Sequence, residues 1–202
     1  MGKGDETRQT ILSQAAQVFS THGYFGTSLD DLMQATNLTK GGIYNHFGSK
    51  EALAVEAFEF GAGQVRERFQ ALLAGRPRNT RSRLLALVEQ FHSLIETPLF
   101  AGGCILLNTA VEADDTNPVL RDRARYFADE WRGFITRTLN KGLELGDVRP
   151  GIDVEAAATI IIAALEGGIM LSKLYDDPEH IRRTARHLEQ YIESLLRPEN
   201  PT

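Results

Sequence analysis

Cysteine is nearly absent from this sequence: Cys104 is the one cysteine among 202 residues. A single cysteine cannot form an internal disulfide, which favours a reducing compartment. The first residues, MGKGDETRQ, contain no apolar run, so no secretory signal is expected. The longest uncharged apolar run covers residues 156–165, which is too short to span a bilayer. These absences predict a cytoplasmic protein with no membrane partner.

Patterns that bind metals or nucleotides are also lacking. The five histidines are scattered and there is one cysteine, so no metal-ligand spacing occurs. The stretch GGIYNHFG lacks the preceding strand and the glycine spacing of a phosphate-binding loop. Cys104 and His92 could be imagined as a nucleophile and its base, but no third group orients them. We therefore expect no metal and no cofactor, and we keep an enzyme as an alternative of a different class.

The chain is acidic, with a net charge of −5, and this counts against nucleic acid as a partner. The charge is unevenly distributed, because residues 1–50 hold four basic and four acidic side chains. The remaining 152 residues hold 18 basic and 23 acidic side chains and carry the whole excess. The N-terminal quarter is therefore the less acidic part of the chain.

Strand signals are nearly absent, whereas helical periodicity extends along the chain and is divided by proline, glycine and asparagine. We expect an all-α fold of about nine helices, with three short N-terminal helices followed by a larger helical domain. The domain boundary is placed at residue 48, where short helices give way to long ones, giving domains 1–48 and 49–202. The expected helices cover residues 5–22, 28–37, 39–47, 49–74, 80–97, 102–113, 118–145, 154–176 and 179–197.

Polar residues mark the helix boundaries near the N-terminus. Ser28 followed by Asp31 resembles a capping box, and Asn37 suits the left-handed turn that would end this helix. Thr39 and Ser49 are the expected N-caps of the next two helices. A short capped helix, a tight turn and a second short helix together form a helix-turn-helix pattern.

The second of these short helices has a bare, polar tip. At about 100° per residue, Ile43 and Phe47 point into the core while Asn45 points away from it. Gly41 and Gly42 carry no side chain, so the tip can approach another surface closely. The N-terminus of a helix also presents free N–H groups that suit phosphate.

This polar side of the helix suits DNA. Tyr44 and His46 lie at its two edges, where each could bond a phosphate, and the remaining exposed groups could contact bases. The alternative is a plain helical corner, because Tyr and His are amphipathic and often lie at the edge of a core. The candidate DNA-binding residues are Thr39, Lys40, Gly41, Gly42, Tyr44, Asn45, His46 and Lys50.

The run TSLDDLMQATNLTKGGIYNHFGSKEAL, residues 27–53, resembles the DNA-binding signature of the TetR/AcrR family of one-component repressors. Asn37 stands where the family usually has glycine, but asparagine tolerates the same backbone conformation. In the C-terminal domain the resemblance is architectural, a long fourth helix followed by five more. The matching features are Thr27-Ser28, Asp31-Leu32, Tyr44, His46-Phe47 and Ser49-Lys50-Glu51, with Phe19 and HGY upstream.

The resemblance implies a homodimer whose third helices enter the major groove of a near-palindromic operator. It also implies a C-terminal domain for ligand binding and dimerisation, in which a ligand shifts the fourth helix and relieves repression. It adds Thr27 and Ser28 to the candidate DNA-binding residues.

The dimer is expected to form through the last two helices, which carry wide apolar faces. The alternative is that these faces pack only within the monomer. A helical adaptor protein would also explain the faces, but not the bare tip at Gly41 and Gly42. The expected interface residues are Ile161, Ala164, Gly168, Ile181, Ala185, Leu188 and Ile192.

The effector is expected in the C-terminal domain and is either a small molecule or a thiol-reactive compound. Cys104 should lie in the first turn of a helix, where a thiolate is stabilised, and it begins a polar stripe with Asn108 and Glu112. The alternative is that these residues, like most aromatic residues at helical spacing, are plain core. The candidate effector residues are Phe91, Phe100, Cys104, Asn108, Phe127, Trp131, Phe134, Glu166 and Met170.

Overall fold

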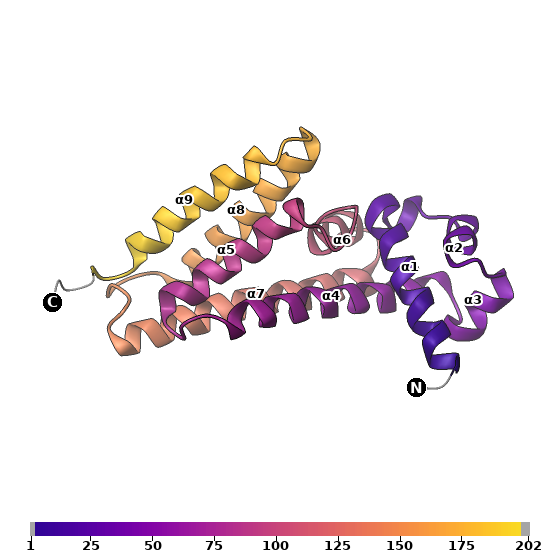
Figure 1. Ribbon diagram of the computed structural model, residues 1–202, viewed down its shortest axis with the longest axis horizontal. Helices are drawn as coiled ribbons and strands as arrows, with labels where there is room; N and C mark the ends of the chain where they lie inside the picture. The colour runs from indigo at the N-terminus through magenta and orange to yellow at the C-terminus, as the bar shows by residue number, and fades with distance from the viewer. Residues whose placement is uncertain (1–2, 199–202) are drawn as a thin grey trace. The chain divides into compact units, whose positions relative to one another are not determined.

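The structure is a computed structural model that describes residues 3–198 of the chain. Within these residues the chain forms nine α-helices, so the predicted all-α fold is confirmed, with a helix-turn-helix followed by a larger helical part (Figure 1). The helices are α1 (Lys3–Gly26), α2 (Leu29–Thr36), α3 (Lys40–Phe47), α4 (Lys50–Ala74), α5 (Thr80–Glu96), α6 (Ile105–Ala113), α7 (Pro118–Leu145), α8 (Val154–Leu174) and α9 (Glu179–Leu195).

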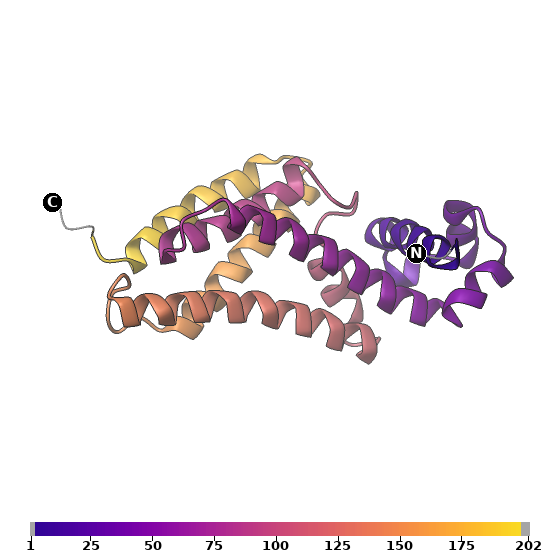
Figure 2. The ribbon, with the colours of Figure 1, turned by 60° about the horizontal axis from the view of Figure 1, so that its bottom comes forward.

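The chain divides into two compact units. The first unit contains the residues up to Arg66 together with Leu99–Phe127, and the second contains Glu67–Pro98 together with the residues from Ala128 onward. In the first unit α1 packs against α2 and α6, and α2 packs against α3; in the second, α5, α8 and α9 pack together (Figure 2). The boundary expected at residue 48 stays a prediction, and residues 1–2 and 199–202 of the expected domains lie outside the described residues.

Two helices differ from the predicted boundaries because of glycines with positive φ. Gly23, expected to end the first helix, has φ 73° and ψ 171°, so it kinks α1, and one more helical turn follows to Gly26. Gly103 has φ 91°, which a helix cannot contain, so α6 begins at Ile105 rather than at residue 102. The other predicted boundaries agree with the structure to within two residues.

The first three helices bury their apolar side chains in the first unit, where α1 packs on α2 and α2 on α3. The buried apolar side chains are Ile11, Leu12, Ala15 and Ala16 of α1, Leu32 of α2, and Ile43 and Phe47 of α3. These three helices therefore share one core, which fixes α3 with its polar side outward.

The second unit is built around an aromatic cluster. Phe69 lies edge-to-face with Trp131 and Phe134, with ring centroids 5.0 and 4.9 Å apart, and Phe91 lies 5.7 Å from Trp131. Such edge-to-face pairs are the favoured packing of aromatic rings in a core.

The apolar part of α8 is longer than the run of residues 156–165 that the sequence analysis considered. Among the described residues it is the helix that is long and apolar enough to cross a bilayer, with 21 residues and a mean hydropathy of 1.8 over its most apolar window. The predicted run ended at the charged residue Glu166, although further apolar residues follow it in the same helix. In the structure α8 packs against α5 and α9, and 33% of that window is buried, so one side of the helix faces its neighbours and the other is open.

Candidate nucleic-acid interface

The start of α2 is fixed by a reciprocal cap. The Ser28 hydroxyl accepts a hydrogen bond from the Asp31 N–H (3.1 Å), and the Ser28 N–H donates to the Asp31 carboxylate (2.7 Å), which confirms the predicted capping box. Hydrogen bonds from the hydroxyl and the backbone of Ser28 hold the pKa of the Asp31 carboxyl below its ordinary value. Asp31 therefore stays ionised and holds the first turn of α2 in place.

The turn into α3 also follows the prediction. Asn37 adopts the left-handed conformation, with φ 54° and ψ 36°, and ends α2. Thr39 caps α3 by accepting a hydrogen bond from the Gly42 N–H at 3.2 Å, and Ser49 caps α4 through the Ala52 N–H at 3.0 Å. Short polar side chains thus set the direction of each helix around the turn.

One side of α3 is open to solvent over its whole length. Ile43 and Phe47 are buried, Tyr44 and His46 are half-buried, and Asn45 is exposed, in agreement with the predicted helical wheel. The exposed residues at the N-terminal end are Thr39, Lys40 and Gly41, with Gly42 half-buried. This side can meet a flat or grooved partner without moving any core residue.

Gly41 is not required by the fold. A Cβ atom built at Gly41 would meet no atom within 4 Å, and the backbone there is helical with no positive φ. Glycine is a poorer helix former than alanine, by up to about 1 kcal/mol, so its presence in the first turn does not help α3 to form. The bare tip therefore needs an explanation outside the folded monomer.

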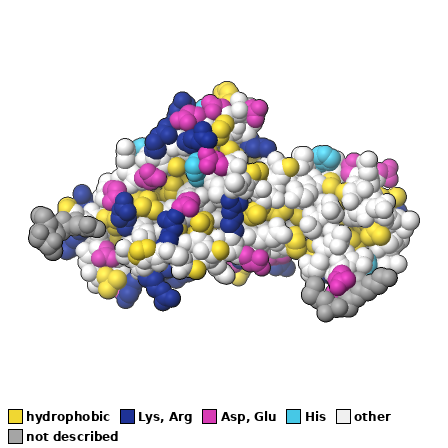
Figure 3. All heavy atoms as spheres, in the orientation of Figure 1, with side chains coloured by type: hydrophobic (Ala, Val, Ile, Leu, Met, Phe, Trp, Pro, Cys, Tyr) yellow, Lys and Arg dark blue, Asp and Glu magenta, His cyan; other side chains and the backbone are white. Residues whose placement is uncertain are grey.

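Two lysines flank the region of α3, since Lys40 is its first residue and Lys50 is the first residue of α4. The Lys40 ammonium is 5.8 Å from the ring centroid of Tyr44, and the Lys50 ammonium is 4.5 Å from that of Tyr24. Partial burial lowers the pKa of Lys50, while nearby carboxylates act in the opposite direction. On the face shown in Figure 3, most of the Lys and Arg side chains lie over helices of the second unit. Lys40 and Lys50 place positive charge at the start of α3 and just beyond its end.

Thr27 does not have the exposed position that a phosphate contact needs. It is 1% exposed, and its hydroxyl and N–H both donate to the Gly23 carbonyl. The family resemblance made Thr27 a candidate, but in this structure its side chain is used to join α1 to α2. The DNA contacts of the other predicted residues stay predictions.

The predicted effector residues belong to two different units. Phe100, Cys104, Asn108 and Phe127 belong to the first unit. Phe91, Trp131, Phe134, Glu166 and Met170 belong to the second, where Met170 is 49% exposed rather than buried in a pocket. Helical spacing could not show this division, because aromatic residues are buried in both units.

A small cavity of about 40 Å³ lies in the first unit, and Asn108 is the one predicted effector residue in its wall. Its wall also includes Phe19, Phe58, Thr109 and Glu112. A drug-sized ligand needs roughly 300 Å³ or more, so this cavity holds water-sized molecules as it stands.

Cys104 lies at the N-cap of α6, just before the first turn in which it was expected. Its side chain makes no capping hydrogen bond and is 6% exposed. Reagents in solution therefore have little access to the thiol in this conformation.

The residues predicted for the dimer interface face the interior of the second unit. Ile161, Ile181 and Ile192 are 0% exposed and Leu188 is 1% exposed, because α8 and α9 pack on each other and on α5. Gly168 and Ala185 are also buried, and a Cβ atom at Gly168 would lie 2.8 Å from the Thr184 hydroxyl. Ala164 is half-buried. These side chains hold the monomer together and are not a free surface.

The sequence interpretation missed an exposed apolar row on the opposite side of α8. Ile160 and Met170 are each 49% exposed and Leu174 is 70% exposed. The row, named here the α8 stripe, repeats every three or four residues, and that spacing was visible in the sequence. The α8 stripe consists of the exposed residues Ala156, Ile160, Ala163, Met170 and Leu174, together with the half-buried Gly167.

Two protein-family models match the chain. The family described as "Bacterial regulatory proteins, tetR family" matches residues 11–57, which contain the helix-turn-helix and the start of α4. The family described as "Tetracyclin repressor-like, C-terminal domain" matches residues 80–188, from α5 into α9.

Relatives of known sequence and structure agree with these matches. The HTH-type transcriptional repressor DhaR of Mycobacterium sp. (strain GP1) is 30% identical over 190 residues, covering 92% of this chain and 88% of that repressor. The crystal structure of a TetR transcriptional regulator from Chloroflexus aurantiacus is 44% identical with a TM-score of 0.93, covering 98% of this chain and 100% of that one. A TetR-family regulator from Cytophaga hutchinsonii is 35% identical with a TM-score of 0.89, covering 98% and 99% of the two chains.

These relatives are transcriptional regulators and not enzymes, so the imagined pair of Cys104 and His92 is set aside. His92 instead lies 3.4 Å from the Glu96 carboxylate, one helical turn along α5. The capped helix-turn-helix, the two family models and the relatives lead to one conclusion. The chain belongs to the tetR family of bacterial regulatory proteins and is a DNA-binding transcriptional regulator.

Proposed function

We propose that this regulator is a cytoplasmic repressor that binds a near-palindromic operator as a homodimer and is released by an effector. Each subunit inserts α3 into the major groove, with Tyr44 and His46 at the phosphates on either side. Base contacts come from Thr39, Lys40 and Asn45, which are all exposed.

The observation that carries this proposal is the bare tip of α3. The fold leaves room for a side chain at Gly41, and glycine does not help the helix to form there. A partner that approaches the backbone explains the glycine, and a helix N-terminus with free N–H groups suits the phosphates of DNA. A helical adaptor would gain nothing from this arrangement.

Regulators of this family bind operator DNA and typically act as dimers. We assign the subunit contact to the α8 stripe, which spans about 27 Å at 1.5 Å per residue. Its side chains are apolar or small and repeat at intervals of three and four residues, as in helix pairs that pack closely. The exposed side of α9 is different, because basic and acidic side chains cover it (Figure 3).

The effector is proposed to bind within the second unit, close to its aromatic cluster. Phe91, Trp131 and Phe134 already lie together there, and Glu166 of α8 is half-buried in the same unit. An apolar wall with a carboxylate favours a ligand that carries a ring and a cationic or hydrogen-bond-donating group. Binding has to separate the packed rings, which would shift α4 through Phe69.

The burial of Cys104 predicts that thiol-reactive compounds are not the fast effector. N-ethylmaleimide is expected to label the native protein at least about tenfold more slowly than the urea-unfolded protein, because reaction needs an exposed thiolate. Operator binding by the wild type and by Cys104→Ser should then be equally insensitive to brief treatment. Rapid release from DNA in the wild type alone would instead identify Cys104 as the sensor.

Selection of bound duplexes from a random DNA pool tests the proposed function. Enrichment of a sequence with two-fold symmetry is the expected result, because two identical subunits read two inverted half-sites.

A further inference from the structure

The kink in α1 breaks the backbone hydrogen bonds of the helix around Gly23. In an uninterrupted helix the Tyr24 N–H would donate to the Ser20 carbonyl, and the Phe25 N–H would donate to the Thr21 carbonyl. With ψ at 171°, Gly23 turns the chain so that these groups no longer face each other. The Tyr24 N–H is half-buried and needs another partner, whereas Phe25 is exposed and its N–H could also be satisfied by water.

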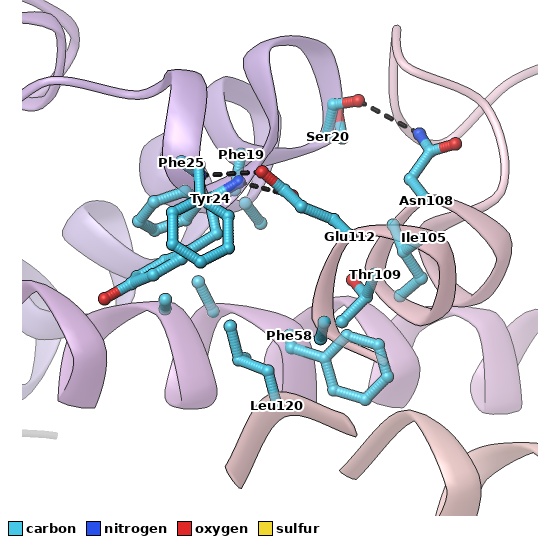
Figure 4. Close-up of a pocket in the computed structure, with 14 residues that line it drawn as sticks. Phe19, Ser20, Tyr24, Phe25, Phe58, Ile105, Asn108, Thr109, Glu112 and Leu120 are labelled. Carbon is cyan, nitrogen blue, oxygen red and sulfur yellow. Dashed lines mark hydrogen bonds between the residues drawn. The ribbon is translucent and has the colours of Figure 1, made fainter. Parts of the chain in front are cut away.

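Two side chains of α6 supply those partners, as Figure 4 shows. The two oxygens of the Glu112 carboxylate accept hydrogen bonds from the Tyr24 and Phe25 N–H groups, each at 2.7 Å. The Asn108 amide donates to the Ser20 carbonyl at 3.2 Å. The polar stripe of α6 that the sequence shows is therefore a splint across the kink, and we refer to Asn108 and Glu112 as the splint.

Beside the splint, α1 and the segment that leads into α6 approach each other too closely for any residue larger than glycine. A Cβ atom at Gly102, just before α6, would lie 1.5 Å from the Ser20 carbonyl oxygen. A Cβ atom at Gly23 would lie 2.7 Å from the Glu112 carboxylate oxygens, and Gly23 also needs positive φ. Both glycines are thus required where α6 meets α1.

Hydrogen bonds connect the splint to the start of the helix-turn-helix. Glu112 caps the helical turn that follows Gly23, and the Gly23 carbonyl accepts the bonds from the hydroxyl and N–H of Thr27. The next residue, Ser28, caps α2. On the other side of the turn, Tyr24 lies under the ammonium of Lys50. The direction of the turn therefore sets the positions of both α2 and Lys50.

We infer that Asn108 and Glu112 are positioning residues for DNA binding, which hold the kinked end of α1 in the orientation that operator contact requires. This inference rests on the proposed function. A simple charge effect predicts the opposite sign, because removing a carboxylate near a DNA-binding surface strengthens binding to phosphate. A loss of affinity when Glu112 is neutralised would therefore report orientation rather than charge.

The test compares Glu112→Ala, Glu112→Gln and the control Asp114→Asn for affinity to the selected operator, thermal unfolding, and amide hydrogen exchange. Asp114 is an exposed carboxylate at the end of the same helix, and it contacts neither Tyr24 nor Phe25. We expect Glu112→Ala to bind at least about tenfold more weakly, since it loses two charge-assisted hydrogen bonds. Glu112→Gln keeps one acceptor oxygen and should be intermediate, and Asp114→Asn should match the wild type or bind slightly more tightly.

Hydrogen exchange gives a readout that does not depend on DNA. The Tyr24 and Phe25 amides should exchange at least about tenfold faster in Glu112→Ala than in the wild type, while amides of α4 keep their rates. Affinities of both Glu112 variants at or above the wild-type value would overturn the inference. So would an affinity loss fully explained by the fraction of protein unfolded at the assay temperature. Failure of the wild type to select any DNA would sink the proposed function, while the exchange rates would still show whether the splint exists.

Discussion

The Gly41→Leu variant is expected to bind the operator on the order of 100-fold more weakly while its fold is at least as stable as that of the wild type. The added side chain meets nothing within 4 Å in the monomer, and leucine is a better helix former than glycine. In the complex it would hold the tip of α3 away from the groove in both subunits. Removing one good pairing between a side chain and a base costs about 1–3 kcal/mol, which gives the expected factor. Titration of labelled operator and thermal unfolding measure the two effects separately.

Gly63→Leu is the matched control for Gly41→Leu. Gly63 is also helical, lies in α4, and a Cβ atom there also meets nothing within 4 Å. This variant should show the same gain in helix stability and no loss of affinity. Unchanged operator binding by Gly41→Leu would show that the bare tip of α3 does not approach DNA. A folded but equally weakened Gly63→Leu would mean that any bulky helix substitution has this effect.

The Ile160→Glu variant is expected to be a folded monomer that has lost tight operator binding. Ile160 is 49% exposed in the single chain, so the substitution costs the monomer little. In a dimer with two-fold symmetry it would place two carboxylates in the apolar subunit contact, where an unpaired charge is strongly unfavourable. Because two linked half-site contacts bind about 10²–10⁴ times more tightly than one, operator affinity should fall by a similar factor. Sedimentation velocity and operator titration measure the two results.

Two other positions make this test specific. Leu145→Glu introduces the same charge at an aliphatic residue that is 63% exposed on α7, and it should remain a dimer. Ile161→Ala, one residue further along α8, removes a fully buried side chain and should lower the melting temperature by several degrees, since such cavities cost about 2–5 kcal/mol. A dimeric Ile160→Glu would exclude the α8 stripe from the subunit contact.

The helix-turn-helix could be predicted in detail because its determinants are local. The capping box of Ser28 and Asp31, the left-handed Asn37 and the Thr39 cap each depend on residues within four positions. The inward direction of Ile43 also follows from helical spacing alone, since the helix is polar on its other side.

The subunit surface could not be predicted in this way because α8 is apolar on both sides. Ile160 and Ile161 are adjacent and chemically identical, yet one is 49% exposed and the other is fully buried. Which side meets α5 and α9 is decided by the packing of elements distant in the sequence, about which the periodicity of one helix carries no information.

Only the side chains of the splint, and not their partners, could be predicted from the sequence. The spacing of Asn108 and Glu112 showed a polar stripe on α6, but not what it faces. Its partners are backbone groups of Ser20, Tyr24 and Phe25, more than 80 residues away in the chain, and they are available only because Gly23 kinks α1. A pattern of side chains cannot show a contact made to backbone atoms.

The most direct test of the central claim, that α3 of each subunit recognises specific DNA in a symmetric pair, is selection from a random duplex pool at near-physiological salt. Wild-type protein and the Gly41→Leu variant would be compared in parallel, each confirmed as folded by thermal unfolding. The account predicts that the wild type enriches a near-palindrome with half-sites about one turn of DNA apart, and that Gly41→Leu enriches none. Enrichment of one unpaired half-site, or no enrichment by a folded wild-type dimer, would contradict it.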